Sequence, residues 1–341
     1  MVIIWLKFIV CTIIIFFCGK RVAYYGDVIA KKTGLGELWV GVILVSIATS
    51  LPEIFTGVGS SLLVDAPDLT VGNLFGANTY NLLNIAILDG VHKGSPLLSA
   101  VSTGQLLTAA LSLIPLSVAS VGILLGSKVP GYSLFNLSLY SIAILGSYLI
   151  SIRIIFKFEK DQKKRLRVLS EEEMRLPDTD TISLKRAFSL YGLFAAGIAG
   201  AGIWLAYIGD DLAITLQVGH NFVGNLFLGL TTTLPEISVS IAALHLGAKE
   251  MALANMLGSN LFNMTIIFIN DLLYQKAPLF NVLSSNHLCT SFVIILMTAM
   301  VIAALVLKPS KKTKVGISSY SLGLILVFIL GTAINFAIGS R

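Results

Sequence analysis

The chain has 341 residues, of which 55% are hydrophobic and only 12% are charged, and its mean hydropathy is +0.87. Soluble domains carry about a quarter charged residues, so this composition excludes an ordinary water-soluble protein. The net charge of +6 does not indicate nucleic-acid binding, because the basic residues lie mainly in short loops between apolar segments, as membrane orientation requires.

The first apolar run, residues 2–19, is interpreted as a retained membrane span. Its charges, Lys20 and Arg21, follow the run and no small-residue cleavage site is evident, so the run does not fit a signal peptide. Further runs of about twenty apolar residues follow, the length that crosses a bilayer as a helix. The ten predicted spans are 2–19, 37–63, 68–89, 103–126, 133–156, 187–208, 222–246, 250–273, 288–307 and 316–338.

Alternating these spans across the membrane separates the basic residues by side. One side receives 20 of the 24 Lys and Arg, the other receives only Lys128, Lys276 and Arg341, and Lys7 lies inside the first span. Cytoplasmic loops carry the excess of basic residues. We therefore predict a multi-pass protein of the plasma (inner) membrane, embedded in the lipid bilayer, with both termini outside.

A charged loop, 157–186, divides the chain into a first half, 1–156, and a second half, 187–341. The loop contains three consecutive acidic residues, Glu171–Glu173, but it carries about as many basic charges. We interpret it as a solvated cytoplasmic linker that is too short to fold as a regulatory domain.

Two segments of the first half recur in the second half. Residues 49–53 read Thr-Ser-Leu-Pro-Glu, and residues 232–236 read Thr-Thr-Leu-Pro-Glu. Residues 72–81 read Gly-Asn-Leu-Phe-Gly-Ala-Asn-Thr-Tyr-Asn, and residues 254–263 read Ala-Asn-Met-Leu-Gly-Ser-Asn-Leu-Phe-Asn. The order and the spacing of the two segments are nearly the same in both halves, which chance does not explain.

The position of these copies predicts the fold. The first copy lies in the second and third spans, and the second copy lies in the seventh and eighth. Five spans separate them, and an odd number reverses the direction in which a span crosses the membrane. The sequence therefore predicts an all-α polytopic membrane protein of ten transmembrane helices, arranged as two inverted five-helix repeats, a plan that recurs in secondary transporters with a site at the repeat interface.

Each copy places a carboxylate, Glu53 or Glu236, near the middle of a predicted span. An unpaired carboxylate at that depth costs roughly 2.5–3.5 kcal/mol on insertion scales. No Lys or Arg occupies a comparable depth in the second, third, seventh or eighth span. A bound cation or a proton is therefore expected to compensate the charge.

A proline precedes each of these glutamates and predicts a break in the helix. Pro52 and Pro235 lack an N–H and disrupt the preceding turn, which frees carbonyl oxygens to line a cavity or to bind an ion. The candidate ligands are the carbonyls of Ser46, Thr49, Gly229 and Thr232, the hydroxyls of neighbouring residues such as Ser50 and Thr233, and the amide oxygens of Asn81 and Asn263.

These candidate ligands are all oxygens, with two formal negative charges. Such a set suits Ca²⁺ or Na⁺, and two carboxylates neutralise one Ca²⁺. Metals that prefer thiolate or imidazole are disfavoured. The cysteines, Cys11, Cys18 and Cys289, have no metal-ligand spacing and are interpreted as buried apolar residues.

The two repeated segments resemble the alpha-repeats of the cation/calcium exchanger superfamily, most closely its prokaryotic sodium/calcium exchanger-like branch. The family pattern is Gly-Thr-Ser-Leu-Pro-Glu followed by Gly-Asn-x-x-Gly-Ser-Asn-x-x-Asn/Asp. The resemblance is most specific over 41–89 and 224–271 and covers the whole chain in outline. It implies a membrane antiporter that exchanges Ca²⁺ for Na⁺ by alternating access, without a cofactor.

The resemblance also implies roles for individual residues. A central Ca²⁺ site would be formed by Glu53 and Glu236 with the backbone oxygens of Thr49 and Thr232, and Asn81 and Asn263 would line the centre. The flanking Na⁺ positions would be occupied by Ala77 and Ser259, with the carbonyls of Ser46 and Gly229.

Three departures from the family pattern bear on the coupling ion. Ala77 replaces the usual Ser, so one flanking Na⁺ position loses its hydroxyl. Asn263 stands where many relatives have Asp. The first Gly of the pattern is Ala48 in one copy and Thr231 in the other. Proton-coupled exchange of Ca²⁺ or another cation is the nearest alternative.

Two further hypotheses remain open at this point. The same scaffold would serve as a transporter for another solute, which predicts a wider cavity with fewer converging oxygens. An intramembrane enzyme that uses Asp89 and Asp271 is disfavoured, because both residues lie at span ends without a Gly-rich motif, and we expect no enzymatic activity. No dimerisation signature is evident, and the oligomeric state stays open.

Overall fold

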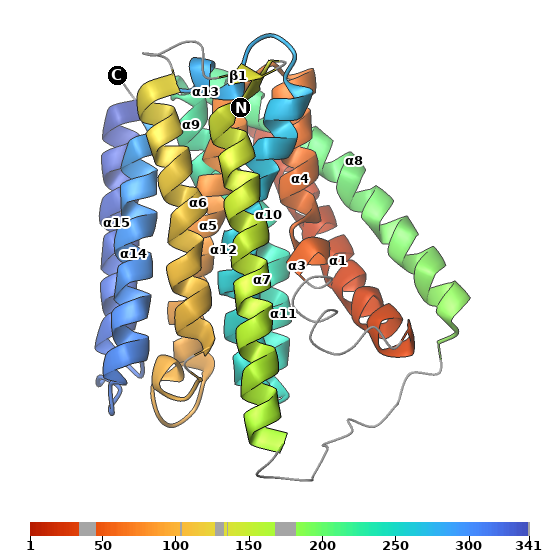
Figure 1. Ribbon diagram of the computed structural model, residues 1–341. Helices are drawn as coiled ribbons and strands as arrows, with labels where there is room; N and C mark the ends of the chain where they lie inside the picture. The colour runs from red at the N-terminus through yellow and green to blue at the C-terminus, as the bar shows by residue number, and fades with distance from the viewer. Residues whose placement is uncertain (34–45, 103, 127–132, 135, 168–181, 340–341) are drawn as a thin grey trace.

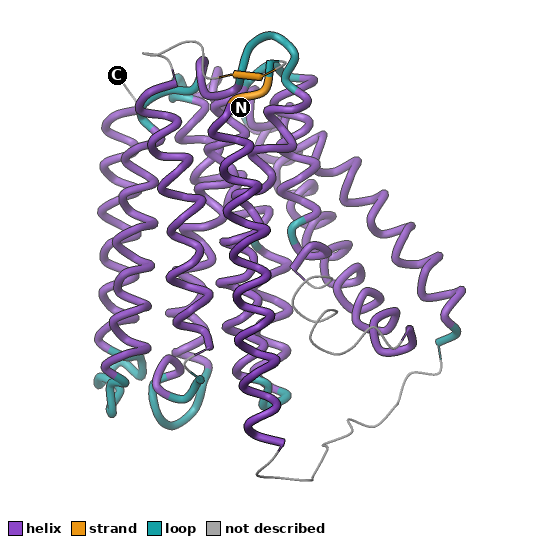
Figure 2. Tube along the Cα trace, viewed as in Figure 1, coloured by secondary structure: helices purple, strands orange, loops and turns teal. Residues whose placement is uncertain are grey.

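The protein is described by a computed structural model, which covers residues 1–33, 46–102, 104–126, 133–134, 136–167 and 182–339. The described residues are almost entirely helical and include one short antiparallel pair of strands (Figures 1 and 2). Among the described residues, eight helical segments are long and apolar enough to cross a membrane.

The first half of the chain contributes one long helix, one broken helix and three further long helices. Their bounds are α1 Val2–Thr33, α3 Ser46–Thr49, α4 Leu51–Val58, the π-helical turn η2 Gly59–Leu63, α5 Pro67–Val91, the 3₁₀ turn η3 Leu97–Ser99, α6 Gly104–Gly126, β1 Ser133–Leu134, β2 Leu137–Ser138 and α7 Leu139–Arg167.

The second half has the same pattern of long and broken helices. Its bounds are α8 Leu184–Leu216, α9 His220–Val223, the π-helical turn η4 Gly224–Leu228, α10 Gly229–Thr232, α11 Leu234–His245, α12 Lys249–Leu273, α13 Leu279–Val282, α14 His287–Leu307 and α15 Ser319–Gly339.

The prediction of ten spans is confirmed in part. The predicted span 37–63 begins outside the described residues, and its remainder is the short series α3, α4 and η2. The span 68–89 is the continuous helix α5, but polar residues along it, Asp68, Asn73, Asn78, Asn81 and Asn84 among them, keep it outside the eight apolar segments.

Three helices extend beyond their predicted spans. Helix α1 continues to Thr33, and α8 runs to Leu216. Helix α7 continues to Arg167, which is inside the predicted linker 157–186. The added segments carry charged residues but no proline, so no proline stops the helix where the apolar run ends. The acidic residues Glu171–Glu173 lie outside the described residues.

Two apolar clusters contain most of the buried apolar residues in the described part of the chain. The larger cluster joins α5, α6, α12 and α14 and includes Leu74, Phe75, Met256 and Met297, all of which are fully buried. The smaller one joins α1, α8 and the region of α9 and η4. Figure 1 shows α1 and α8 side by side at one edge of the bundle and α14 and α15 side by side at the other.

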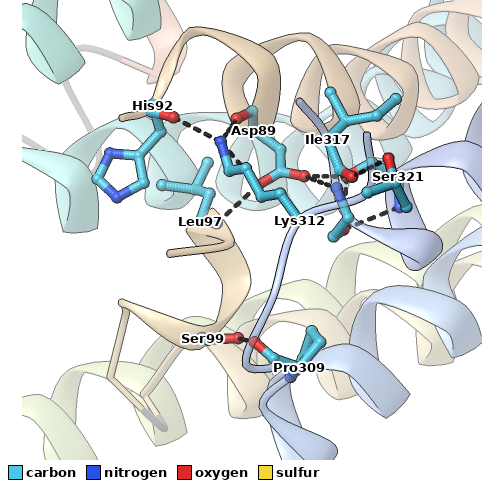
Figure 3. Close-up of polar contacts among 10 residues, drawn as sticks. Asp89, His92, Leu97, Ser99, Pro309, Lys312, Ile317 and Ser321 are labelled. Carbon is cyan, nitrogen blue, oxygen red and sulfur yellow. Dashed lines mark hydrogen bonds and ion pairs between the residues drawn. The ribbon is translucent and has the colours of Figure 1, made fainter. Parts of the chain in front are cut away.

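The end of α5 is fastened to the start of α15 by a buried carboxylate, Asp89. Its Oδ1 accepts a hydrogen bond from the backbone N–H of Leu97 at 2.7 Å. Its Oδ2 accepts from Ser318 N and from Ser321 Oγ, both at 2.7 Å (Figure 3). Because N–H groups at a helix start are unpaired and carry partial positive charge, a carboxylate is well suited to this position.

The end of α12 is fastened to the start of α7 in the same way. Asp271 Oδ1 accepts from Leu279 N at 2.6 Å, and its Oδ2 accepts from Ser138 N at 2.9 Å and from Ser141 Oγ. In each case the carboxylate also fixes the loop that follows its own helix, through an N–H eight residues later.

Carboxylates at the other ends of α5 and α12 also accept hydrogen bonds from the opposite half of the chain. Asp68, at the start of α5, accepts from Ser284 N at 2.8 Å, and the ring of His287 lies 2.9 Å from the same oxygen. Glu250, at the start of α12, accepts from Ser102 N at 2.6 Å and from Ser102 Oγ at 3.1 Å. Carboxylates therefore hold both ends of α5 and both ends of α12 to segments of the other half of the chain.

Candidate ion-binding site

The helix breaks that the prolines predict lie directly before the two glutamates. Helix α3 ends at Thr49 and α4 begins at Leu51, with Ser50 between them at φ −87° and ψ 8°. Helix α10 ends at Thr232 and α11 begins at Leu234, with Thr233 between them at φ −86° and ψ −1°. The two copies of the motif thus have the same local backbone.

Glu53 and Glu236 are both fully buried, and neither oxygen of either carboxyl has a hydrogen-bond partner of standard geometry. The Glu53 carboxyl lies beside the side chain of Thr232. The Glu236 carboxyl lies beside the side chains of Thr49 and Ser50 and within range of the charge of Glu53. Each carboxyl therefore faces hydroxyl groups of the other motif.

The helix break changes the hydrogen bonding of the backbone N–H of each glutamate. In an unbroken helix the glutamate N–H would bond the carbonyl four residues earlier, that of Thr49 or Thr232. In both copies this N–H lies beside the glutamate's own carboxyl. The main-chain ladder resumes one residue later, where Ile54 N bonds Ser50 O and Ile237 N bonds Thr233 O, each at 3.2 Å.

The carbonyl of Gly229 accepts hydrogen bonds within its own turn. It accepts the backbone N–H of Thr233 at 3.3 Å and the hydroxyl of Thr233 at 2.8 Å. The break therefore lies after this carbonyl, and the hydroxyl of Thr233 is engaged in its own helix. Ser46, the corresponding residue of the first copy, is the first residue of α3.

The predicted amide ligands, Asn81 on α5 and Asn263 on α12, are both fully buried. The amide oxygen and the amide nitrogen of Asn81 have no partner. Asn263 donates its Nδ2 to Asn78 Oδ1 at 3.1 Å, and its oxygen has no partner. Both residues therefore keep an amide oxygen available in the interior.

The two positions that the family resemblance assigns to Na⁺ differ in chemistry. Ser259 on α12 is fully buried and its hydroxyl has no hydrogen-bond partner. Ala77 on α5 is fully buried and offers no side-chain oxygen. The hydroxyl of Ser50, at the first helix break, is also buried without a partner.

Two further asparagines, Asn73 and Asn255, lie against the site. Asn73 Oδ1 accepts the hydroxyl of Thr232 at 3.1 Å. Asn255 donates its Nδ2 to the backbone oxygen of Glu236 at 3.2 Å and to Ser240 Oγ at 3.0 Å. Asn73 is the second residue of the segment 72–81, and Asn255 is the second residue of the segment 254–263. The sequence therefore already indicated a role for both, because the Asn recurs at the same place in each copy.

Small residues bring α5 and the broken seventh segment together. A Cβ on Gly76 would lie 2.2 Å from the backbone oxygen of Asn225, and one on Gly72 would lie 2.7 Å from that of Asn221. A Cβ on Gly229 would lie 2.8 Å from Ala77 N. Gly72 and Gly76 therefore allow the backbones of the two segments to approach closely.

The arrangement fits a hard cation and does not fit a thiolate or imidazole metal. Among the described residues, no three His, Cys, Asp or Glu side chains gather into a metal site. The cysteines are free thiols, and only Cys11 is buried, whereas Cys18 and Cys289 are half-buried within their helices. What gathers instead is a set of buried oxygens without partners. In a membrane interior such a set needs an ion, a proton or water.

Comparison with known proteins gives one family. The chain matches the sequence profile of a family described as "Sodium/calcium exchanger protein" over residues 3–157 and 186–337, which is most of its length. It is 25% identical over 276 residues to "Inner membrane protein YrbG" of Escherichia coli, with 76% of each chain covered. It is 21% identical over 259 residues to "Putative antiporter CaxA" of Alkalimonas amylolytica, covering 75% of this chain and 76% of that one.

A shorter sequence match and a superposition on a solved structure also point to sodium/calcium exchangers. The chain is 31% identical over 91 residues to "Sodium/calcium exchanger MaX1" of Methanosarcina acetivorans, which covers 26% of this chain and 25% of that one. A structure of the sodium-calcium exchanger NCX_Mj soaked with 10 mM Na⁺ and no Ca²⁺ superposes with a TM-score of 0.60 at 18% identity, covering 98% of this chain and 99% of that one. At this identity the superposition shows a shared fold.

Proposed function

Because the chain belongs to the sodium/calcium exchanger family, we propose that it is a secondary antiporter that exchanges Ca²⁺ for Na⁺ at a site in the middle of the membrane. The observation that carries the proposal is the pair Glu53 and Glu236. Two fully buried carboxylates without hydrogen-bond partners face hydroxyl groups of each other's motif. A divalent cation is the simplest charge that satisfies both at once.

For the fold we propose ten transmembrane helices in two inverted five-helix repeats, 1–156 and 187–341, joined by the linker 157–186. The matched helix breaks before Glu53 and Glu236 support this arrangement. So do the matched carboxylates at the ends of α5 and α12, each of which binds a helix of the opposite half. From the distribution of Lys and Arg we propose that both termini face outward and that the linker lies in the cytoplasm.

For the site we propose that Glu53 and Glu236 bind the divalent cation together with backbone oxygens of Thr49 and Thr232. The amide oxygens of Asn81 and Asn263 and the hydroxyl of Ser50 complete the lining. Ser259 supplies a flanking Na⁺ position together with main-chain oxygen, for which the carbonyls of Ser46 and Gly229 are the proposed sources. The hydroxyl of Thr233 bonds the carbonyls of Gly229 and Leu230 in its own turn.

Proton coupling is the second candidate for the driving ion. The specific observation in its favour is Ala77, which leaves one flanking position without the hydroxyl that Ser259 provides in the other half. A buried carboxylate can be neutralised either by a proton or by a metal cation, so both ions are compatible with the same two glutamates.

The proposal is tested by Ca²⁺ uptake into membrane vesicles that contain the protein. An outward Na⁺ gradient should drive uptake of radioactive Ca²⁺, and an ionophore that collapses the Na⁺ gradient should abolish it. Uptake driven equally by a proton gradient, with no Na⁺ present, would identify proton coupling. Vesicles that take up no Ca²⁺ under either gradient would contradict Ca²⁺ exchange altogether.

A further inference from the structure

A pair of asparagines locks α5 to α12 beside the candidate site. Asn78 Nδ2 donates to the backbone oxygen of Asn260 at 3.3 Å, and Asn260 Nδ2 donates to the backbone oxygen of Asn78 at 3.2 Å. Both side chains are buried, with 2% and 3% exposure. The two hydrogen bonds are reciprocal, so each residue serves the other helix in the same manner.

This reciprocal pair fixes which way each amide points. Rotating the amide of Asn78 by half a turn would set its Oδ1 against the carbonyl oxygen of Asn260, so two acceptors would face each other and a donor bond would be lost. The Oδ1 of Asn78 is therefore held away from Asn260 as a fixed acceptor. Its partner is the Nδ2 of Asn263, at 3.1 Å.

The fixed acceptor in turn sets the orientation of Asn263. Because the nitrogen of Asn263 is bound to Asn78, the oxygen is the end of the amide that remains without a partner in the interior. An amide oxygen is a ligand for Ca²⁺ or Na⁺, whereas the NH₂ group is not. An amide turned the other way would present hydrogens to a site built for cations.

In the first half, the amide of Asn81, which corresponds to Asn263, is not held in a fixed orientation by a neighbouring asparagine. Asn81 corresponds to Asn263 and Asn260 corresponds to Asn78, but among the described residues no hydrogen bond joins Asn81 to Asn260. The Oδ1 of Asn260 and both amide atoms of Asn81 have no partner. One of the two amide ligands is thus held in a fixed orientation and the other is not.

We propose that Asn78 is a positioning residue, which holds the amide of Asn263 so that its oxygen faces the transported cation. The proposal rests on the proposed function, since it takes Asn263 to be a ligand of the site. Asn78 does not itself line the cation site. It affects cation affinity through its hydrogen bond to Asn263.

Asn260 supplies a matched control for Asn78. Asn78→Ala and Asn260→Ala each remove one of the two reciprocal bonds between α5 and α12, so they weaken the helix contact equally. Only Asn78→Ala also removes the partner of Asn263. The measurement is Ca²⁺ uptake by vesicles against Ca²⁺ concentration, with the amount of inserted protein determined for each variant.

We expect Asn78→Ala to raise the half-saturating Ca²⁺ concentration by about fivefold, the effect of one buried hydrogen bond, with the maximal rate changed less than about twofold. Asn260→Ala should stay within about twofold of the unmodified protein. In an Asn263→Ala background, Asn78→Ala should cause no further rise. Equal rises in Asn78→Ala and Asn260→Ala, or an undiminished rise in the Asn263→Ala background, would overturn the proposal.

A second measurement separates this proposal from the proposed function. Thermal unfolding of the purified protein without cations reports the hydrogen bond directly, and the losses from Asn78→Ala and Asn263→Ala should be less than additive. Additive losses would show that the two residues act independently. If the unmodified protein neither transports Ca²⁺ nor gains thermal stability from it, the proposed function fails, whereas a less-than-additive pair still supports the hydrogen bond.

Discussion

The carboxylates of Asp89 and Asp271 make the same set of hydrogen bonds in opposite halves of the chain. Each accepts one backbone N–H from the loop eight residues after it, and each accepts an N–H and a hydroxyl from two serines at the start of a helix. The serines that bind Asp89 lie just before and within the first turn of α15, and those that bind Asp271 lie just before and within the first turn of α7. Each half of the protein therefore supplies hydrogen bonds that hold the end of a central helix of the other half.

The first prediction concerns these two carboxylates. Asp89→Asn and Asp271→Asn should each lower the free energy of unfolding by about 2 kcal/mol, because the bonds lost are to a charged acceptor in a buried position. The measurement is the thermal unfolding midpoint in detergent. Asp65→Asn is the control, since Asp65 forms an exposed pair with Lys276. A midpoint for Asp89→Asn as high as that of Asp65→Asn would be inconsistent with this account.

The second prediction concerns the glutamates of the proposed site. Glu53→Gln and Glu236→Gln keep the shape of the side chain and each removes one of two charges, so each should abolish Ca²⁺ uptake while the protein remains folded and inserted. Asp211→Asn, which changes an exposed carboxylate on α8, should leave uptake unchanged. Near-normal uptake by either glutamine variant counts decisively against a central Ca²⁺ site.

The third prediction concerns the coupling ion. Ala77→Ser adds a hydroxyl on the face of α5 that also carries Asn81 one turn later, and we expect it to lower the half-saturating Na⁺ concentration for Na⁺-driven Ca²⁺ flux. A hydrogen bond or ligand contact of about 1 kcal/mol corresponds to a change of about fivefold. Ser259→Ala, the reverse change in the other half, should raise it. No change in either variant would show that neither position binds Na⁺.

The fourth prediction concerns the contact between α5 and η4. Gly76→Ala places a Cβ where the backbone of Asn225 already lies, so we expect little folded protein. Gly146→Ala, in α7, meets no atom within 4 Å and should be neutral or stabilising by about 0.5–1 kcal/mol, since Ala favours a helix. The yield of monodisperse protein after purification distinguishes them. Equal yields would mean that the helices separate easily.

The fifth prediction concerns pH. Desolvation, together with the charges of Lys312 and Lys249, lowers the pKa of His92 below its ordinary value of 6.5, although Asp89 opposes this shift. The folded protein then binds fewer protons than the unfolded chain between the lowered pKa and 6.5, so His92 makes stability fall as the pH drops below 6.5. Unfolding midpoints from about pH 8 to pH 5 measure this loss. His92→Gln should reduce it, and an identical pH profile in that variant would assign the loss to other groups.

The local features of the site were accessible from the sequence, because they depend on residues close together in the chain. Pro52 and Pro235 predict the helix breaks, and the repeated Leu-Pro-Glu identifies the buried carboxylates. The engaged carbonyl of Gly229 was not predicted, because it depends on which rotamer the hydroxyl of Thr233 adopts. The roles of Asn73 and Asn255 were missed although both residues recur, since recurrence alone does not show which neighbour an amide will bind.

The long-range fastenings were beyond prediction from local pattern. Asp89 and Asp271 were expected at helix ends, and they lie two residues before the ends of α5 and α12. Nothing near Asp89 in the sequence indicates that its partners are Ser318 and Ser321, since any helix start offers similar donors. Likewise, the charged segment after 156 was read as linker because its apolar run had ended, whereas a helix needs no apolar residues where water surrounds it.

The bonds of Asp89 also have a consequence for biosynthesis. Ser318 follows Asp89 by 229 residues, so the ribosome completes α5 long before it makes the helix that holds its end. Asp271, by contrast, finds Ser138 already in place. Newly inserted α5 therefore lacks these hydrogen bonds until α15 is made, and we expect membrane proteases to degrade a polypeptide truncated before α15. Two separately synthesised halves should accumulate only when a cell makes both.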